Sequence, residues 1–491
     1  MKLNFKHFSY LLLAAGMLLV GCSKDSTTPE GENGGKPTEV SKDNSLTGFA
    51  IKADKNSVVS VNGSGVHGAG IIYLTLKEGT PLESLIPTFK IHKKAVAKID
   101  GKKIVSDSSV IDFSKTQTIT VTSESGQSAS YKILVRTGND KIDKMVYNFM
   151  ITHDLPGVSV AISQNEQIAY VGSYGFSDKS RNKRVNENTL FRLASMSKQH
   201  AAIGIMELYR RGLLDIDDTI FGKGGILEEM YGDDMGAQWK RITVRDILSH
   251  SSGISTDCIF GGLSAYSGKS SQERLRTLLN NNETPGYTVG QRFSYNNSNF
   301  LIAGVIVEYL SGKPFMQFLK EEIYSPYGIE DIYGGMNTEA EKRENECVYY
   351  GQDGKNPYGN DVEAGVAAGG VIASTTALMN LMARLDYQPG VEDIFPAEIL
   401  DLMYTAKAGM KDGSGNVWNR YGLGWRVNYP TAGFSNWAAY HGGTLAGVCT
   451  IWARGKNNVN GVVLCNSRSY NQSIDDRMWE MLRDIQNMFA N

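Results

Sequence analysis

The alternation of apolar and polar residues divides the chain into two parts near residue 138. Before that point, short segments with a period of two predict β-strands, as at residues 118–122 and 131–136, with Gly126 in the turn between them. Further strands are expected at residues 48–53, 71–76, 86–91 and 109–113. Short strands at this spacing over residues 45–137 predict a small all-β sandwich.

After residue 138, helical and strand patterns follow each other. Apolar residues at helical spacing predict an amphipathic helix over residues 142–150 and another over 474–488. Strands are expected at residues 157–163, 167–172, 438–440, 448–453 and 461–466, with a mainly helical or irregular middle to about residue 373. This order predicts an α/β (α+β) domain over residues 138–491, in which an antiparallel sheet is flanked by terminal helices and joined to a helical lobe. A cleft between sheet and lobe is the natural place for a site.

The first 44 residues carry a different signal. Lys2 and Lys6 precede an apolar run, residues 11–20, that is too short for a typical membrane span and is followed by Cys22. Residues 22–44 are polar and rich in Gly, Pro and Glu, which predicts a flexible linker. The start resembles a bacterial lipoprotein signal, which implies a signal peptide at 1–21, lipidation of Cys22, and a place in the outer membrane, on its periplasmic face or at the cell surface. An ordinary signal peptide or a short anchor is the alternative.

Composition narrows the function classes. The 491 residues are 41% hydrophobic and 21% charged, with a formal net charge of -2, which is typical of a globular protein without a nucleic-acid surface. The seven histidines are scattered and no C-x-x-C pair occurs, so we expect no metal site. The chemistry that the motifs below indicate implies no organic cofactor either. Cys449 and Cys465 flank a Gly/Asn-rich turn and could face each other across a hairpin, either as a disulfide or as two buried thiols.

The first candidate for chemistry is a serine three residues before a lysine at the start of a predicted helix. Ser195 and Lys198 would share one helix face, where an amine can take, or help to take, the proton of a hydroxyl nucleophile. The pattern alone is weak, since Ser180 and Lys183 repeat it in a polar loop.

The second candidate is a Tyr-x-Asn sequence. Tyr295 and Asn297 stand just before an apolar helix predicted over residues 300–310, whereas the other copy, Tyr358 and Asn360, lacks such a helix. A phenol with a pKa of about 10 in water ionises more readily beside a lysine ammonium, and Tyr295 is then a candidate base toward the serine.

The third candidate is His441-Gly442-Gly443-Thr444, which leads into a predicted strand. Glycines let the backbone approach a ligand closely, and the amide of Thr444, together with that of Ser195, would form an oxyanion hole. A plain glycine turn into a hairpin is the alternative.

In this order the three motifs resemble those of the serine β-lactamase and penicillin-binding-protein superfamily, above all its class C β-lactamase-like branch. The resemblance covers residues 139–491. Other stretches that fit this branch are residues 191–198, 214–219, 242–253, 365–374 and 421–425. The β-sandwich before it is similar to immunoglobulin-like modules of bacterial lipoproteins, and we expect a spacer, with carbohydrate or partner binding as the alternatives.

The resemblance implies a role for each residue. Ser195 is the acylated nucleophile, Lys198 its proton partner, Tyr295 the general base and then acid, and Asn297 a ligand of the acyl side. His250 matches a structural position of the family. The competing Ser-His-Asp design on a G-x-S-x-G elbow finds no such elbow in the sequence.

The third motif departs from the family pattern. His441 stands where a lysine is usual, so its charge is expected to depend on pH near 6.5, and Gly442 replaces the usual threonine. We therefore expect weak action on β-lactams and a serine hydrolase acting through an acyl-enzyme on an ester or amide, esterase-like or D-amino-acid peptidase-like. Its substrate would be a small molecule, a peptide or a peptidoglycan fragment. The alternatives are a penicillin-binding D,D-carboxypeptidase or β-lactamase, and a catalytically silent binding protein.

Overall fold

The computed structural model describes residues 40–68, 70–281, 285–428, 437–470 and 473–490. The expected signal peptide, the lipidation site Cys22 and most of the expected linker lie outside these ranges. In the described ranges, every helix is too short or too polar to cross a bilayer.

Residues 47–138 form an all-β domain, as the alternation predicts. A three-stranded sheet has the order β2-β1-β5, and a six-stranded sheet has the order β3-β4-β9-β8-β6-β7. Both surround one apolar core, in which Phe113 and Ile133 are fully buried. The strands are β1 (Thr47–Ile51), β2 (Gly63–Ser64), β3 (Val66–Gly68), β4 (Ile71–Lys77), β5 (Pro87–Lys90), β6 (Val96–Ile99), β7 (Lys102–Ile104), β8 (Gln117–Thr122) and β9 (Ser128–Gly138).

The structure of this domain differs from the sequence-based prediction in two details. The strand expected at residues 109–113 is a single bridge between Ile111 and Leu85, because its apolar residues are buried in the core without a ladder. Strands β6 and β7 were not predicted, since lysines fill their outward positions and weaken the apolar pattern.

The second domain is built on a seven-stranded antiparallel sheet with the order β12-β11-β10-β19-β18-β17-β16. The first and last parts of the domain therefore meet at its centre, where Val160 lies opposite Val463. The antiparallel sheet is confirmed. Its strands are β10 (Gly157–Gln164), β11 (Gln167–Asp178), β12 (Lys183–Arg184), β16 (Arg426–Val427), β17 (Trp437–Leu445), β18 (Val448–Gly455) and β19 (Val459–Cys465).

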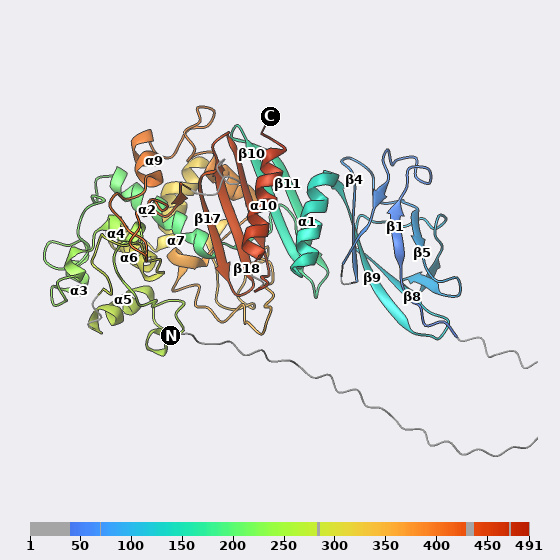
Figure 1. Ribbon diagram of the computed structural model, residues 1–491, viewed down its shortest axis with the longest axis horizontal. Coiled ribbons are helices and arrows are strands. Elements are labelled where there is room, and N and C mark those ends of the chain that lie inside the picture. Colours follow the sequence, from blue (N-terminus) through green and yellow to red (C-terminus); the bar gives the residue numbers. More distant parts are fainter. Residues whose placement is uncertain (1–39, 69, 282–284, 429–436, 471–472, 491) are drawn as a thin grey trace, which may run out of the picture.

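Helices cover both faces of this sheet. The terminal helices α1 (Asp140–Thr152) and α10 (Ile474–Asn487) pack on one face, between the sheet and the β-domain, and the helical lobe lies on the other side (Figure 1). Helix α1 begins at Asn139, whose side chain accepts from the amides of Lys141 and Ile142. The lobe contains α2 (Ser197–Arg210), α3 (Glu228–Tyr231), α4 (Val244–Leu248), α5 (Ser271–Asn280), α6 (Ser298–Ser311), α7 (Phe315–Leu319), α8 (Thr375–Met382) and α9 (Ala397–Tyr404).

A small sheet links the lobe to the large sheet. It has the order β13-β15-β14, and Phe191 lies opposite Ala373 and Arg192 opposite Ile372. Its strands are β13 (Phe191–Arg192), β14 (Ile332–Gly334) and β15 (Val371–Ala373). Because β13 leads directly into the segment with Ser195, this sheet fixes where that serine lies.

Candidate active site

Ser195 lies in a short 3₁₀ turn, Ala194–Met196, between β13 and α2. The turn is held on both sides: the amide of Leu193 donates to Val371 O at 2.8 Å, and Thr450 Oγ1 of β18 donates to Leu193 O at 2.9 Å. Ala194 has a φ of 50°, in the left-handed region that is costly for a residue with a Cβ atom. The chain is therefore bent sharply at the residue before the candidate nucleophile, and the surrounding sheet maintains the bend.

Lys198 stands in the first turn of α2 and is completely buried. Its Nζ lies 3.2 Å from Ser195 Oγ, and it donates to Asn297 Oδ1 and to Ala368 O, both at 2.7 Å. The expected shared face of Ser195 and Lys198 is thus present.

Burial lowers the pKa of Lys198 to about 7, since desolvation penalises its cation; the Asp257 carboxylate opposes this shift and the Arg426 guanidinium adds to it. A large part of Lys198 is therefore neutral amine near neutral pH. A buried neutral amine has a lone pair available to accept a proton.

Tyr295 precedes α6 in a loop that a buried histidine supports. The ring of His250 lies 4.2 Å, centroid to centroid, from the Tyr295 ring, and His250 Nδ1 accepts from the amide of Asn296 at 3.2 Å. Burial lowers the pKa of His250 well below its ordinary value, so this ring is neutral. His250 packs behind Tyr295, in agreement with the structural place that the family pattern implies.

Tyr295 keeps 36% of its surface exposed in the pocket. Desolvation by the protein around it raises the pKa of its hydroxyl to about 12, while a hydrogen bond with Ser195 and the charge of Arg426 lower it. Lys198 Nζ lies 4.9 Å from the ring centroid. At neutral pH Tyr295 is thus a phenol in contact with the nucleophile, and it can give up a proton only when it receives another.

Asn297 connects the lysine to a carboxylate. Its Oδ1 accepts from Lys198, and its Nδ2 donates to Asp257 Oδ2 at 2.7 Å. Asp257 lies in a loop of the helical lobe and lines the same pocket. The sequence reading missed this residue because no motif surrounds it.

His441 corrects the expectation of a pH-dependent cation. Its Nδ1 donates to Gly442 O at 2.7 Å, and a hydrogen bond of 3.0 Å joins its Nε2 to the Tyr421 hydroxyl. In a neutral ring Nε2 accepts from that hydroxyl. Desolvation lowers its pKa well below 6.5, and the nearby charges of Arg426 and Lys198 lower it further. His441 is therefore a neutral residue of the pocket wall at neutral pH.

The two glycines after His441 differ in their surroundings. A Cβ atom on Gly443 would lie 2.1 Å from Leu193 O and 2.3 Å from Thr450 Oγ1, so only glycine lets β17 pass this close to the nucleophile turn. A Cβ atom on Gly442 would meet nothing nearer than 3.5 Å. Thr444 and Ser195 line the same pocket, and the oxyanion hole between their amides stays a prediction.

Arg426 supplies a positive charge that the sequence reading did not assign. It stands on β16, opposite Tyr440 of β17 and so beside His441, and its guanidinium carbon lies 5.9 Å from the Tyr295 ring centroid. Arg426 directly follows the stretch 421–425 that fits the family. A single arginine outside any motif does not indicate that its side chain enters the site.

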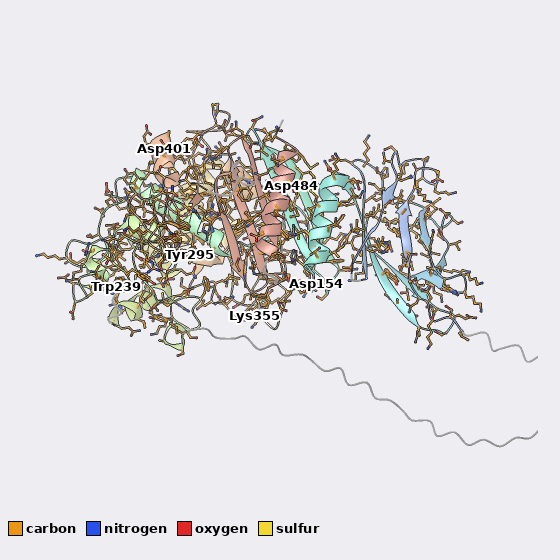
Figure 2. All side chains as sticks on the ribbon, viewed as in Figure 1. Asp154, Trp239, Tyr295, Lys355, Asp401 and Asp484 are labelled. Atoms are coloured by element: carbon orange, nitrogen blue, oxygen red, sulfur yellow. The ribbon has the colours of Figure 1, made fainter. Side chains whose placement is uncertain are left out.

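Of the predicted catalytic and substrate-binding residues, all but the buried Lys198 and Gly443 line one pocket of about 430 Å³. Figure 2 shows Tyr295 where the helical lobe meets the strands of the sheet, the place predicted for a cleft. The pocket is lined by Ser195, Asp257, Phe260, Tyr295, Asn297, Gly369, Arg426, His441, Gly442, Thr444 and Leu445.

The competing copies of the motifs lie elsewhere. Ser180 donates to Asp178 in the turn between β11 and β12, where Lys183 reaches Glu344 O. The Tyr358 hydroxyl accepts from the amide of Tyr349. None of these residues lines the pocket around Ser195.

The predicted pairing of two cysteines across a hairpin is present as well. Cys449 of β18 lies opposite Cys465 of β19, and both are buried free thiols. Within the described ranges, no cluster of three or more His, Cys, Asp or Glu residues is arranged to hold a metal ion.

A family model described as Beta-lactamase matches residues 142–483. The chain belongs to the beta-lactamase family. A second family model, described as "SGBP, N-terminal", matches residues 50–135, within the β-domain. The similarity of that domain to immunoglobulin-like modules stays a prediction.

Two relatives from Bacillus subtilis are distant in sequence. Penicillin-binding protein 4* of Bacillus subtilis is 25% identical over 183 residues, covering 36% of this chain and 38% of that protein. N-acetylmuramyl-L-alanine amidase of the same species is 27% identical over 199 residues, covering 39% and 45%. The chain thus spans less than half the length of these two relatives.

Solved structures support the fold. The octameric penicillin-binding protein homologue of Pyrococcus abyssi aligns with a TM-score of 0.59 and 21% identity, over 72% of this chain and 77% of that one. A beta-lactamase/D-alanine carboxypeptidase from Yersinia pestis aligns with a TM-score of 0.57 and 16% identity, over 71% and 98%. The beta-lactamase-like fold of the second domain is thereby confirmed.

Proposed function

We propose that this chain is a serine hydrolase that cleaves an ester or an amide through an acyl-enzyme on Ser195. The observation that carries the proposal is the 3.2 Å distance between Ser195 Oγ and Lys198 Nζ, with the pKa of that buried lysine lowered to about 7. A hydroxyl held beside a neutral amine is an activated nucleophile.

The contacts of Lys198 support a definite path for the proton. A neutral amine has two N–H groups, which donate to Asn297 Oδ1 and Ala368 O, and one lone pair, which is left for the Ser195 hydroxyl. Lys198 takes the serine proton as Oγ attacks the substrate carbonyl carbon. Tyr295 then donates its phenolic proton to the leaving group and recovers one from Lys198, and water releases the acyl group by the reverse path.

This division of roles differs from the expectation that Tyr295 acts as the first base. Because the pKa of the Tyr295 phenol is raised to about 12, very little of the basic phenolate exists at pH 7. The Lys198 amine, with a pKa of about 7, is half deprotonated at that pH and can act as the base. Tyr295 serves better as the proton donor of the second step.

Arg426 supports a substrate with a negative charge on the leaving-group side. It stands beside His441, and both line the pocket of Ser195. A guanidinium binds carboxylates well, and here it replaces the cation that neutral His441 does not provide. The names of the Bacillus subtilis relatives agree with a peptide or peptidoglycan-fragment substrate.

The same arginine favours a second candidate, a penicillin-binding D,D-carboxypeptidase or β-lactamase, because β-lactams and D-Ala peptides also carry a carboxylate. Two tests on the purified protein separate the candidates: labelling with a fluorophosphonate or a fluorescent penicillin, and turnover of p-nitrophenyl esters, aminoacyl anilides and nitrocefin. Labelling by the fluorophosphonate alone favours an esterase-like or peptidase-like enzyme, labelling by both a penicillin-recognising one, and labelling by neither a silent binding protein. The proposal requires that Ser195→Ala abolish labelling and turnover while its circular dichroism spectrum matches the wild type.

We also propose that Cys22 carries a lipid and anchors the enzyme in the outer membrane, with residues 22–44 as a tether and the β-domain as a spacer. The support is the basic start, the short apolar run and the cysteine of the sequence. Expression of the full chain with a radiolabelled fatty acid should label the wild type and leave Cys22→Ser unlabelled and outside the membrane fraction. Equal labelling of both would contradict the anchor.

A further inference from the structure

The pocket contains one carboxylate that the proton path does not use. Asp257 Oδ2 accepts from Asn297 Nδ2 at 2.7 Å, and Oδ1 accepts from the amides of Ile259 and Phe260 at 3.0 and 2.9 Å. The loop around it is fixed to the start of α6, where Ser298 Oγ donates to Thr256 O at 2.7 Å. Asp257 is thus held rigidly at the pocket wall.

This carboxylate forms no direct ion pair in the described part of the chain, and Asn297 stands between it and Lys198. The ion pairs found there, with nitrogen and oxygen within 4.0 Å, do not include Asp257. A carboxylate offers about four acceptor sites, and the three hydrogen bonds leave one of them open. A partly buried carboxylate of this kind is stabilised by a positively charged partner.

The two charges of the pocket come from opposite structural units. Asp257 belongs to the helical lobe and contacts Asn297, whereas Arg426 belongs to the sheet and stands beside His441. Ser195 lines the same pocket as both. A substrate that extends across Ser195 with its leaving group toward Arg426 therefore places its acyl group toward Asp257.

We propose that Asp257 binds an ammonium group on the acyl half of the substrate, so that the enzyme prefers aminoacyl esters or amides with a free amino group. The inference rests on the proposed serine hydrolase function and names its substrate class. The open acceptor site of Asp257 receives an N–H of the ammonium, and Arg426 receives a carboxylate on the leaving group. A dipeptide with free termini satisfies both charges at once.

A purely structural role for Asp257 makes a different prediction. If the residue only closes its turn and orients Asn297, then its replacement lowers activity equally on every substrate. If it binds an ammonium, the loss falls on substrates that carry that charge. The deciding quantity is the ratio of kcat/KM between a free aminoacyl substrate and its N-acetylated form.

The test uses D- and L-alanine p-nitroanilide, their N-acetyl forms and p-nitrophenyl acetate with the purified protein at pH 7. The wild type should cleave at least one free aminoacyl anilide about 10- to 100-fold faster, in kcat/KM, than its N-acetyl form, as expected for a charge-assisted hydrogen bond. Asp257→Asn should lose most of that ratio; any change that the lost charge makes in the pKa of Lys198 alters the rates on the free and the N-acetyl anilide alike and cancels in the ratio. Asp353→Asn is the matched control, because Asp353 is an exposed loop residue with a φ of 52°, a conformation that asparagine also adopts.

Three results would overturn the inference. The first is a wild type that prefers the N-acetyl anilides, and the second is an equal loss on charged and neutral substrates in Asp257→Asn. If Asp257→Asn does not fold, Asp257→Ser replaces it, because the serine hydroxyl can still accept from the turn amides. The third result is a ratio of kcat/KM between free and N-acetylated anilide that is unchanged in Asp257→Ser. Fluorophosphonate labelling of Ser195 separates the two proposals: a labelled enzyme without ammonium preference refutes only this inference, and an unlabelled, inactive protein refutes both.

Discussion

At the residue scale, the environment of one lysine determines how the site depends on pH. Lys198 is cut off from water, and its two carbonyl acceptors are satisfied equally by a neutral amine. The identity of this residue is visible in the sequence, but its protonation state depends on burial and on Asp257 and Arg426, which are distant in sequence.

The first prediction concerns the pH profile. Since the pKa of Lys198 is lowered to about 7, the neutral base is lost as pH falls, and kcat/KM for p-nitrophenyl acetate should drop about tenfold per pH unit below 6. Above about pH 8 the rate should be flat, because almost all of the lysine is then neutral. A rate that continues to climb tenfold per unit from pH 8 to 10 would instead identify Tyr295, with its raised pKa, as the titrating base.

The second prediction contrasts the two glycines of β17. Gly442→Thr has room for its Cβ and restores the hydroxyl that the family usually places there, so acylation by a fluorescent penicillin should become several-fold faster. Gly443→Ala would press against Leu193 O and Thr450 and should lose at least about 100-fold in acylation or fail to fold. Equal labelling rates in wild type, Gly442→Thr and Gly443→Ala would contradict the contrast.

At the element scale, the periodicity of apolar residues predicted the main helices and strands. The contacts between individual residues could be found only in the structure. The amphipathic patterns located α1 and α10 to within a few residues, and alternation located β10, β18 and β19. The same rule failed at residues 109–113, since burial in a core produces an apolar pattern with or without a ladder.

The sequence predicted only some of the residues of the site. Ser195, Lys198, Tyr295 and Asn297 stand in motifs, and the fold brings them together. Asp257 and Arg426 stand in no motif, because each reaches the pocket through a loop or an edge strand whose position depends on the whole domain. The neutral state of His441 depends on its burial and on the charges of Arg426 and Lys198.

The third prediction tests how β18 holds the nucleophile turn. Thr450→Val keeps the shape of the side chain but removes its hydrogen bond to Leu193 O, which should cost about 1 kcal/mol of unfolding free energy. The activity should also fall several-fold, because the Ser195 turn is less well fixed. Thr118→Val, on the exposed face of β8, is the control and should change neither urea unfolding nor kcat. Identical kcat values in both variants would show that this bond does not position the nucleophile.

At the scale of the whole molecule, the two domains share a polar network that buries one carboxylate. Asp143 of α1 accepts from Thr75 of β4 at 2.8 Å, from Tyr174 of β11 at 2.7 Å, and from Arg136 of β9. Next to this network, the Tyr73 ring stacks on the Tyr147 ring, with the ring centroids 4.6 Å apart. The β-domain is thus fixed to the helix that covers the seven-stranded sheet.

The fourth prediction follows from that network. Asp143 is fully buried, and its loss leaves the mostly buried Arg136 guanidinium without its partner, so Asp143→Ala should cost about 3–5 kcal/mol. Asp140→Ala removes an exposed pair with Lys144 on the same helix and should cost at most about 1 kcal/mol. Because Asp143 joins the domains, differential scanning calorimetry should show the β-domain melting earlier and separately in Asp143→Ala, while Ser195 labelling at low temperature persists. If both variants showed a single coincident melting transition, the domains would be coupled by apolar packing alone. The Asp143 carboxylate would then contribute nothing to the coupling between the domains.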